Sequence, residues 1–261
     1  MDKNITVAVF SPTGGTKRVA EAVVAGMNAG DQQVTWVDLS KPRVDSSAPH
    51  ALAKDDVMVV AVPVFGGRVP AAAIERLRAM NGNGAKAVAI AVYGNRAYED
   101  ALLELTDTLG ECGFTVVAGV TAVAEHSIAR SVAAGRPDAA DLVELQEFGA
   151  QIARKLDGGE TAFSCDIPGN KPYREYAGLP FHPKAKKRAC TGCGACARTC
   201  PVGAIDLASP WDTNKDLCIS CMRCVAVCPA NARALGKIPS IVSARKLKPY
   251  AAERKDNELF L

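Results

Sequence analysis

Short apolar runs alternate with longer amphipathic stretches over the first 157 residues of the chain. The apolar runs are nearly continuous, which is typical of strands that helices cover on both faces. These runs are Ile5–Phe10, Val34–Leu39, Val57–Val62, Ala87–Tyr93 and Phe114–Ala124. The stretches between them predict helices, at Thr16–Met27, Ala71–Met80, Tyr98–Leu109 and Ala139–Leu156. This order predicts an α/β fold with a doubly wound parallel five-stranded sheet.

Residues that favour helix ends support these boundaries. Helix starts are indicated at Thr16, Pro70 and Asp138, and helix ends at Gly30, Asn81-Gly82 and Gly110. The alternating pattern stops at Asp157 and the two glycines after it. Residues 1–157 are therefore predicted to form one domain.

The remaining residues divide into three parts. Residues 158–180 contain proline and glycine and predict a linker or an arm that wraps over the surface. Residues 181–236 form a compact cysteine-rich module. Residues 237–261 are a C-terminal tail of mixed charge and scattered apolar positions, for which we expect either a short helix packed on one domain or disorder.

The cysteine-rich module contains two C-x2-C-x2-C-x3-C-P runs, repeated at an offset of 28 residues, and they hold eight of the ten cysteines. This spacing is the bacterial pattern for iron–sulfur ligation, in which the fourth cysteine of each run binds the other cluster. The expected ligands of one cluster are Cys190, Cys193, Cys196 and Cys228. Those of the other are Cys218, Cys221, Cys224 and Cys200.

The module resembles a bacterial two-[4Fe-4S] ferredoxin, which implies a small α+β domain with two [4Fe-4S] clusters. Zinc is the alternative, but it usually takes pairs of cysteines separated by a spacer rather than two such triple runs. A spacer of 17 residues between Cys200 and Cys218 departs from the family pattern and predicts a loop beside a cluster. The isolated Cys112 and Cys165 are expected to be buried or merely tolerated thiols.

The first apolar run leads directly into a loop of hydroxyl and glycine residues, followed by a predicted helix. Its members are Ser11, Pro12, Thr13, Gly14, Gly15 and Thr16. Such a loop at a helix N-terminus favours an anion such as a phosphate group. It has neither the Walker A spacing nor the G-x-G-x-x-G dinucleotide fingerprint, and an ordinary turn is the alternative.

In its context the loop resembles the phosphate loop of flavodoxins, with matches at Ser11, Thr13, Gly14 and Thr16. The resemblance implies a flavodoxin-like domain over residues 1–157, strand order 2-1-3-4-5, and FMN at the point where the strand order reverses. Two further loops would flank the flavin ring. They consist of Pro63, Val64, Phe65, Gly66 and Gly67, and of Tyr93, Gly94, Asn95 and Arg96.

The first flanking loop departs from the flavodoxin pattern. Flavodoxins that carry electrons often have a tryptophan there, whereas this chain offers only Phe65 beside two glycines. The resemblance therefore implies thin stacking on that side of the ring. Arg68 and Arg96 are candidates to neutralise the ligand, or else solvated arginines, and His126 is either a group near the ring or a structural histidine.

The distribution of charge along the chain bears on whether the protein binds nucleic acid. Residues 1–160 carry 15 basic and 20 acidic side chains, whereas residues 161–261 carry 16 and 8. The basic half lacks interleaved aromatic residues and is weak support for nucleic-acid binding. The basic run from Lys184 to Arg188 is expected to be solvated or to steer an acidic redox partner.

The N-terminal residues lack the features of a secretory signal. No apolar run approaches the roughly 18 residues that span a bilayer. We therefore expect a cytoplasmic protein without a membrane span.

The whole chain resembles a flavodoxin–ferredoxin fusion, which implies an electron-transfer protein that couples two [4Fe-4S] clusters to FMN. One alternative is a flavin-dependent reductase that acts directly on a small acceptor, with the ferredoxin domain as its internal relay. A second alternative is a scaffold or regulatory protein without flavin. The expected partner is a soluble redox protein or a small-molecule electron acceptor, and a homodimer is left open.

Overall fold

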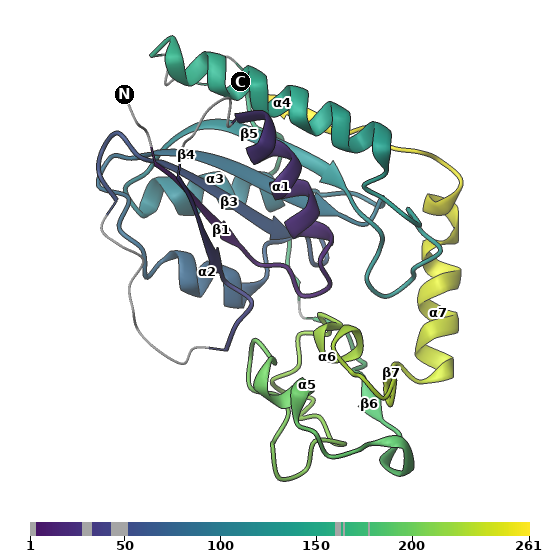
Figure 1. The fold of residues 1–261 in the computed structure, drawn as a ribbon. Coiled ribbons are helices and arrows are strands. Elements are labelled where there is room, and N and C mark those ends of the chain that lie inside the picture. The colour runs from purple at the N-terminus through teal and green to yellow at the C-terminus, as the bar shows by residue number, and fades with distance from the viewer. Residues whose placement is uncertain (1–3, 28–32, 43–51, 160–162, 164, 177) are drawn as a thin grey trace.

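The computed structural model describes residues 4–27, 33–42, 52–159, 163, 165–176 and 178–261. Figure 1 shows an α/β domain and, beneath it, a smaller module that contains the cysteines. A long C-terminal segment runs from this module back along the side of the larger domain.

The core of the larger domain is a sheet in the order β2-β1-β3-β4-β5-β8. The first five members are parallel and confirm the predicted strands: β1 (Ile5–Val9), β2 (Val34–Asp38), β3 (Val57–Pro63), β4 (Lys86–Tyr93) and β5 (Thr115–Val123). Their order is the flavodoxin-like doubly wound order 2-1-3-4-5. The predicted fold class is confirmed.

The prediction of five strands is one short, because the C-terminal β8 (Glu258–Phe260) pairs antiparallel with the outer edge of β5. Its three residues are too few for a strand pattern to stand out in the sequence. An unpaired edge strand leaves a row of backbone N–H and C=O groups without partners. The tail supplies these partners over part of β5.

Two layers of helices cover the sheet (Figure 1). Helices α1 (Gly15–Met27) and α4 (Ala139–Asp157) bury Val19, Val23, Leu145 and Ile152 with one set of strand residues. Helices α2 (Ala71–Leu77) and α3 (Ala101–Glu111) enclose the other hydrophobic cluster, with Ile74, Leu77, Leu102 and Leu105. Successive strand residues alternate between the two clusters, as the pleat requires.

Helices α1 and α4 approach each other at two glycines. A Cβ atom on Gly26 would collide with the backbone of Gln146, and one on Gly149 would collide with the carbonyl of Val23. This close crossing explains two glycines inside helices, where glycine otherwise costs about 1 kcal/mol relative to alanine.

The helix starts follow the sequence better than the ends do. The side chain of Asp138 accepts hydrogen bonds from the N–H groups of Ala140 and Asp141, and Asp141 completes a capping box. Pro70 caps α2, which ends at Leu77, before the predicted stop. Helix α3 begins at Ala101 rather than at Tyr98, because Glu99 has a φ of +48° and interrupts the helix. The predicted stop at Gly30 lies outside the described residues.

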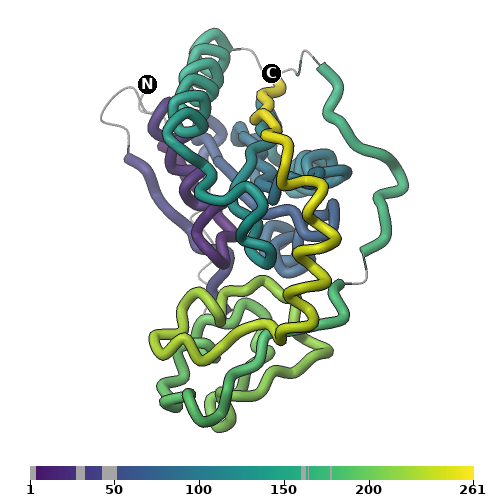
Figure 2. The backbone as a smooth tube through the Cα atoms, turned by 90° about the vertical axis from the view of Figure 1, so that its right-hand side faces the viewer, coloured from purple at the N-terminus to yellow at the C-terminus, as the bar shows by residue number. Residues whose placement is uncertain are grey.

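The segment after α4 is an arm that wraps over the α/β domain. Its described residues form no helix or strand, and Figure 2 shows the arm descending the side of the molecule. The carboxylate of Asp100 accepts hydrogen bonds from the N–H groups of Asn170 and Arg174, both at 2.8 Å. Ile167 packs against the hydrophobic cluster beneath α2 and α3.

The cysteine module has two similar halves. Helix α5 (Ala195–Arg198) lies in the first cysteine run, and α6 (Arg223–Ala226) lies at the corresponding place in the second. Strands β6 (Lys184–Ala185) and β7 (Arg233–Ala234) pair antiparallel, and the 3-10 turn η1 (Lys187–Ala189) follows β6. This is the small α+β domain that the resemblance to two-[4Fe-4S] ferredoxins implies.

The tail contains more structure than the sequence indicates. Helix α7 (Lys237–Leu247) and the 3-10 turn η2 (Lys248–Ala251) lead to β8. The expected short helix is present as α7, and the alternative of disorder is wrong for this segment. The tail does not stay on one domain, because it leaves the cysteine module and ends in the sheet of the other domain (Figures 1 and 2).

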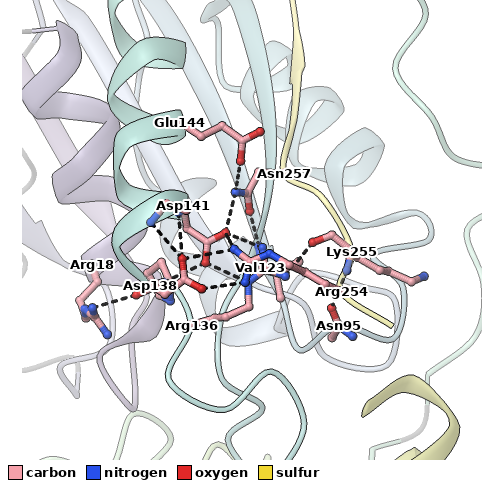
Figure 3. Close-up of polar contacts among 12 residues, drawn as sticks. Arg18, Asn95, Val123, Arg136, Asp138, Asp141, Glu144, Arg254, Lys255 and Asn257 are labelled. Carbon is pink, nitrogen blue, oxygen red and sulfur yellow. Dashed lines mark hydrogen bonds and ion pairs between the residues drawn. The ribbon is translucent and has the colours of Figure 1, made fainter. Parts of the chain in front are cut away.

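A buried polar cluster fixes the tail just before β8 (Figure 3). Asn257 is 5% exposed, and its amide oxygen accepts a hydrogen bond from the N–H of Val123 at 2.9 Å. Its amide nitrogen donates to Glu144 at 2.6 Å and to Asp141 at 3.2 Å. Asp141 also pairs with Arg136 and with Arg254 of the tail. The tail is therefore held to the α/β domain by buried hydrogen bonds and ion pairs.

Candidate functional site

A cavity of about 740 Å³ opens at the carboxyl ends of the parallel strands. This is the place where open α/β sheets bind their ligands. Loops after β1, β3, β4 and β5 form one side of it. The arm, the cysteine module and α7 form the other.

Most of the residues predicted to hold a cofactor border this cavity. They are Pro12, Thr13, Gly15, Thr16, Pro63, Val64, Phe65, Gly66, Tyr93, Gly94 and Arg96. Three loops that are far apart in the sequence are thus brought to one place.

Four predicted residues do not border the cavity. Ser11 accepts a hydrogen bond from the N–H of Lys17 at 3.0 Å and so braces the loop from behind. Gly14 and Gly67 have φ values of +96° and +87° and shape their turns. Asn95 is 2% exposed and donates to the carbonyls of Tyr250 and Glu253, so it binds the tail.

The loop after β1 meets the first turn of α1. The first N–H groups of a helix have no acceptor within the helix and carry the positive end of its dipole. Gly15 and Thr16 belong to this turn and border the cavity. The loop therefore has the geometry of an anion site with a neutral, hydroxyl-bearing wall.

His126 is a structural residue that also borders the cavity. Its Nδ1 accepts hydrogen bonds from the N–H groups of Ile128 at 3.2 Å and Ala129 at 3.1 Å. Burial lowers the pKa of His126, and the positive charge of Arg96 acts in the same direction. The ring is therefore neutral near pH 7 and carries its proton on Nε2.

The two arginines of the flanking loops have different surroundings. Arg96 borders the cavity and pairs with Glu99 at 2.8 Å. Arg68 pairs with Glu104 at 2.7 Å and lies over the ring of Tyr173. Arg68 thus anchors the arm, and only Arg96 is placed to act on a ligand in the cavity.

The residues that close the cavity were not predicted from the sequence. Tyr176 of the arm lies against Gly66, where a Cβ atom would collide with the tyrosine ring. An aromatic side chain therefore covers the loop that lacks the tryptophan of electron-carrier flavodoxins. Further lining comes from Leu179, Phe181, Ile219, Ser220, Cys221, Ile238, Val242, Lys246, Leu247 and Tyr250. No local signal in the sequence connects these positions with the strand loops.

Two small hollows lie within the cysteine module. Cys190, Cys193, Cys196 and Cys228 border one of them. Cys200, Cys218, Cys221 and Cys224 border the other. Each hollow thus takes three cysteines from one run and the fourth from the other run, as the spacing predicts. These residues fit two four-iron clusters.

The surroundings of the sulfur atoms also fit bound clusters. Backbone N–H groups of Ala204 and Ala232 donate to the sulfurs of Cys200 and Cys228, both at 3.3 Å. Hydrogen bonds of this kind tune iron–sulfur clusters. Burial raises the pKa of Cys224 to about 11 and that of Cys221 to about 12. Ligation would therefore release protons from these thiols.

The remaining candidates for metal binding are a site for a single metal ion and the two cysteines outside the two cysteine sets. Within the part of the chain that the structure describes, no three His, Cys, Asp or Glu side chains converge as a single metal ion requires. Cys112 is half-buried, and burial raises the pKa of its thiol. Cys165 is exposed.

The two sites meet at Cys221. This residue borders both the second hollow and the large cavity, as does Ile219, whereas Ser220 borders the large cavity alone. In the other set, Cys193 is exposed to solvent. One set of cysteines therefore adjoins the cavity, and the other reaches the surface.

Two arginines hold the cysteine module against the α/β domain. Arg223 donates to the carbonyl of Ser11 at 3.3 Å and lies 3.6 Å from the carboxylate of Asp38. Arg76 of α2 donates to the carbonyls of Leu39 and Pro201. Each domain thus contributes one cation to the contact.

Comparison with protein families identifies the cysteine module. Residues 189–232 match the family described as a 4Fe-4S dicluster domain. A search among curated proteins found no match. None of the helices in the described ranges is both long and apolar enough to cross a membrane.

Solved structures similar to this chain include flavodoxins and an NADH:FMN oxidoreductase. A flavodoxin from the domain Archaea is 20% identical over 59% of this chain and 99% of its own, with a TM-score of 0.42. Oxidised flavodoxin 1 from Bacillus cereus is 17% identical over 58% of this chain and 98% of its own, with a TM-score of 0.44. The apo form of an NADH:FMN oxidoreductase is 18% identical over 59% and 90%, with a TM-score of 0.44.

The strand order and the family match together define the class of protein. The chain is a fusion of a flavodoxin-like α/β domain with a 4Fe-4S dicluster domain of the ferredoxin type.

Proposed function

We propose that this protein transfers electrons between an FMN in the large cavity and two [4Fe-4S] clusters in the cysteine module. The observation that carries the proposal is the position of Cys221, which borders both the cavity and the second hollow. When bound, iron–sulfur clusters exchange single electrons whereas a flavin exchanges one or two, so together they couple the two kinds of transfer.

The residues of the cavity have distinct roles in this proposal. Thr13, Gly15 and Thr16 would hold the phosphate at the start of α1, where the helix dipole favours an anion. The flat ring would lie between the strand loops and the arm, against Phe65 and Tyr176. The apolar lining supplied by the arm and α7 would exclude water from it.

The two cysteine sets would have different positions in the transfer. The set with Cys221 adjoins the cavity, and the set with the exposed Cys193 would exchange electrons with a soluble redox protein. Exposed basic side chains, among them Lys187, Arg188 and Arg198, lie in this part of the module and favour an acidic partner. Cysteines in the cytoplasm stay reduced and rarely form disulfides, which leaves them free to bind clusters. A cytoplasmic location therefore belongs to the proposal.

A second candidate function is a reductase that acts on a small acceptor at the flavin itself. Arg96, His126 and Lys246 border the cavity and favour this candidate, because they add cationic and hydrogen-bonding groups to apolar walls. Turnover of a small acceptor by the reduced protein alone would separate it from a carrier that needs a partner protein.

Cofactor content tests the proposal directly. Anaerobic purification followed by iron, sulfide and flavin quantitation should give about eight irons per chain, since two four-iron clusters are proposed, and about one FMN. The control variants Cys112→Ser and Cys165→Ser, outside both cysteine sets, should keep this content. Zinc in place of iron would overturn the cluster assignment, and iron without flavin would favour the scaffold alternative.

A further inference from the structure

The repeat of 28 residues continues past the last cysteines and contains one large difference. Cys200 corresponds to Cys228, and five positions later Ile205 corresponds to Arg233. Both residues are buried, with 6% of Ile205 and 3% of Arg233 exposed. An arginine thus occupies a core position where the repeat has an isoleucine.

The guanidinium of Arg233 extends between the two hollows. Its Nη1 donates to the carbonyl of Pro210 at 2.5 Å and lies 3.7 Å from the sulfur of Cys196, and both residues border the first hollow. Its Nη2 donates to the carbonyl of Pro183 at 3.2 Å and to the hydroxyl of Thr213, and both of these border the second hollow. Arg233 thus borders the first hollow itself and is hydrogen-bonded to two residues that border the second.

The charge of Arg233 is not neutralised by a protein carboxylate in the part of the chain that the structure describes. Its oxygen partners are backbone carbonyls and one hydroxyl, including the carbonyl of Asp212 at 3.4 Å. Its Nε is buried without a hydrogen-bond partner among the described residues. A buried charge without an opposite charge is strongly unfavourable. Eight cysteine thiolates around the two hollows would supply that opposite charge.

We propose that Arg233 is a shared electrostatic residue that raises the reduction potentials of both [4Fe-4S] clusters. The inference rests on the proposed cluster content. In a redox titration each cluster takes one electron from the reductant, with no atom transferred, and becomes more negative by one charge. A nearby buried cation stabilises that reduced state, because charge and hydrogen bonding around a cluster set its potential.

Redox titration of the purified holoprotein, followed by EPR, tests the proposal. Arg233→Ile gives the second half of the module the residue of the first, and Arg233→Gln keeps a polar side chain without the charge. Both variants should shift the potentials of both clusters to lower values. Arg233→Lys keeps the charge and should remain near the wild-type values.

Ile205→Val is the matched control, since it changes the corresponding core position without changing charge. It should leave both potentials unchanged. Unchanged potentials in the Ile and Gln variants, at full iron content, would show that Arg233 is only structural. A shift confined to one cluster would contradict a shared role.

Cluster assembly gives the remaining outcomes. If Arg233→Ile loses its iron, the cluster potentials of Arg233→Gln and Arg233→Lys are compared with those of the wild type instead. Lower potentials in the Gln variant alone would support the proposal. Loss of iron in Gln and Lys alike would show that the hydrogen bonds rather than the charge are required, and would overturn the inference. A protein without flavin would contradict the proposed function while leaving this titration valid, whereas wild-type protein without iron would overturn both.

Discussion

Cys200 and Cys228 are each the last cysteine of their own run, and each borders the hollow formed by the first three cysteines of the other run. The spacing alone predicts this crossing, because three cysteines at C-x2-C-x2-C already occupy one small volume. The structure adds the hydrogen bonds that their sulfurs accept from Ala204 and Ala232. The two halves of the module therefore depend on each other for ligands.

Double variants test the crossing by iron content. Cys200→Ala should leave about four irons, because it removes a ligand from one of two four-iron clusters. Adding Cys221→Ala should remove no further iron, since both residues serve the same cluster. Adding Cys193→Ala instead should remove nearly all of it. The opposite result for the two pairs would show that each run binds its own cluster.

Tyr176 shows at the scale of one residue how the structure changes the interpretation of a loop. The sequence predicts thin stacking beside Phe65 and two glycines. The arm places the ring of Tyr176 against Gly66, more than a hundred positions away in the chain. The cover of the cavity is therefore thicker than the loop itself suggests.

At the scale of elements, α7 and β8 connect the two domains. Helix α7 borders the cavity, whereas β8 pairs with β5 beyond the cluster around Asn257. Ile238 and Ile241 of α7 are 76% and 65% exposed, so the helix buries little apolar surface of its own. Its position depends on the anchors at its two ends.

Asn257→Ala should weaken the anchor of the tail. It removes the acceptor for the N–H of Val123 and a donor to Asp141 and Glu144. Loss of a buried hydrogen-bond partner costs about 1–3 kcal/mol. Denaturant unfolding should show this decrease in the free energy of unfolding, and limited proteolysis should cut α7 faster than in wild type. Asp256→Asn, at the exposed neighbouring position, is the control. Unchanged proteolysis of α7 would show that β8 does not hold it.

At the scale of the whole molecule, the contact between the domains decides whether the two sites can exchange electrons. Arg223 lies between Cys221 and Cys224 in the second cysteine run and contacts the loop before α1. Arg76 belongs to α2 of the α/β domain and contacts the module at the carbonyl of Pro201. These bonds hold the second cysteine set beside the cavity.

Removal of these arginines should slow electron exchange between the domains. A hydrogen bond to a charged group contributes about 1.5–3 kcal/mol, and each 1.4 kcal/mol corresponds to a factor of ten in the docking equilibrium. Arg223→Ala and Arg76→Ala should therefore slow flavin reduction through the module, measured by anaerobic stopped-flow absorbance.

Iron and FMN content should stay at wild-type values in both variants. Arg76→Ala is the more informative of the two, since Arg76 belongs to α2 and is remote in sequence from the cysteines. Arg154→Ala, which removes an exposed arginine of α4 that pairs with Glu147 of the same helix, is the matched control for charge. Wild-type rates in both interface variants would show that these bonds do not set the geometry of transfer.

Local patterns in the sequence determine the parallel strands, their helices and the cysteine sets. Continuous apolar runs such as Val57–Val62 predict buried strands, and Asp138 predicts the start of α4. The three loops at the carboxyl ends of the strands follow from the same pattern. In each case the signal lies within a few residues, because hydrogen bonding and ligand spacing act locally there.

The tertiary structure alone decides what closes the cavity and what joins the domains. Arg223 and Ser11 are 212 positions apart, and Thr121 and Glu258 are 137 positions apart. Such contacts depend on chain geometry after folding, and a three-residue strand or a single arginine carries no periodic signal. The sequence by itself thus determined which chemistry this protein contains, whereas packing between distant segments decided how its two sites are placed side by side.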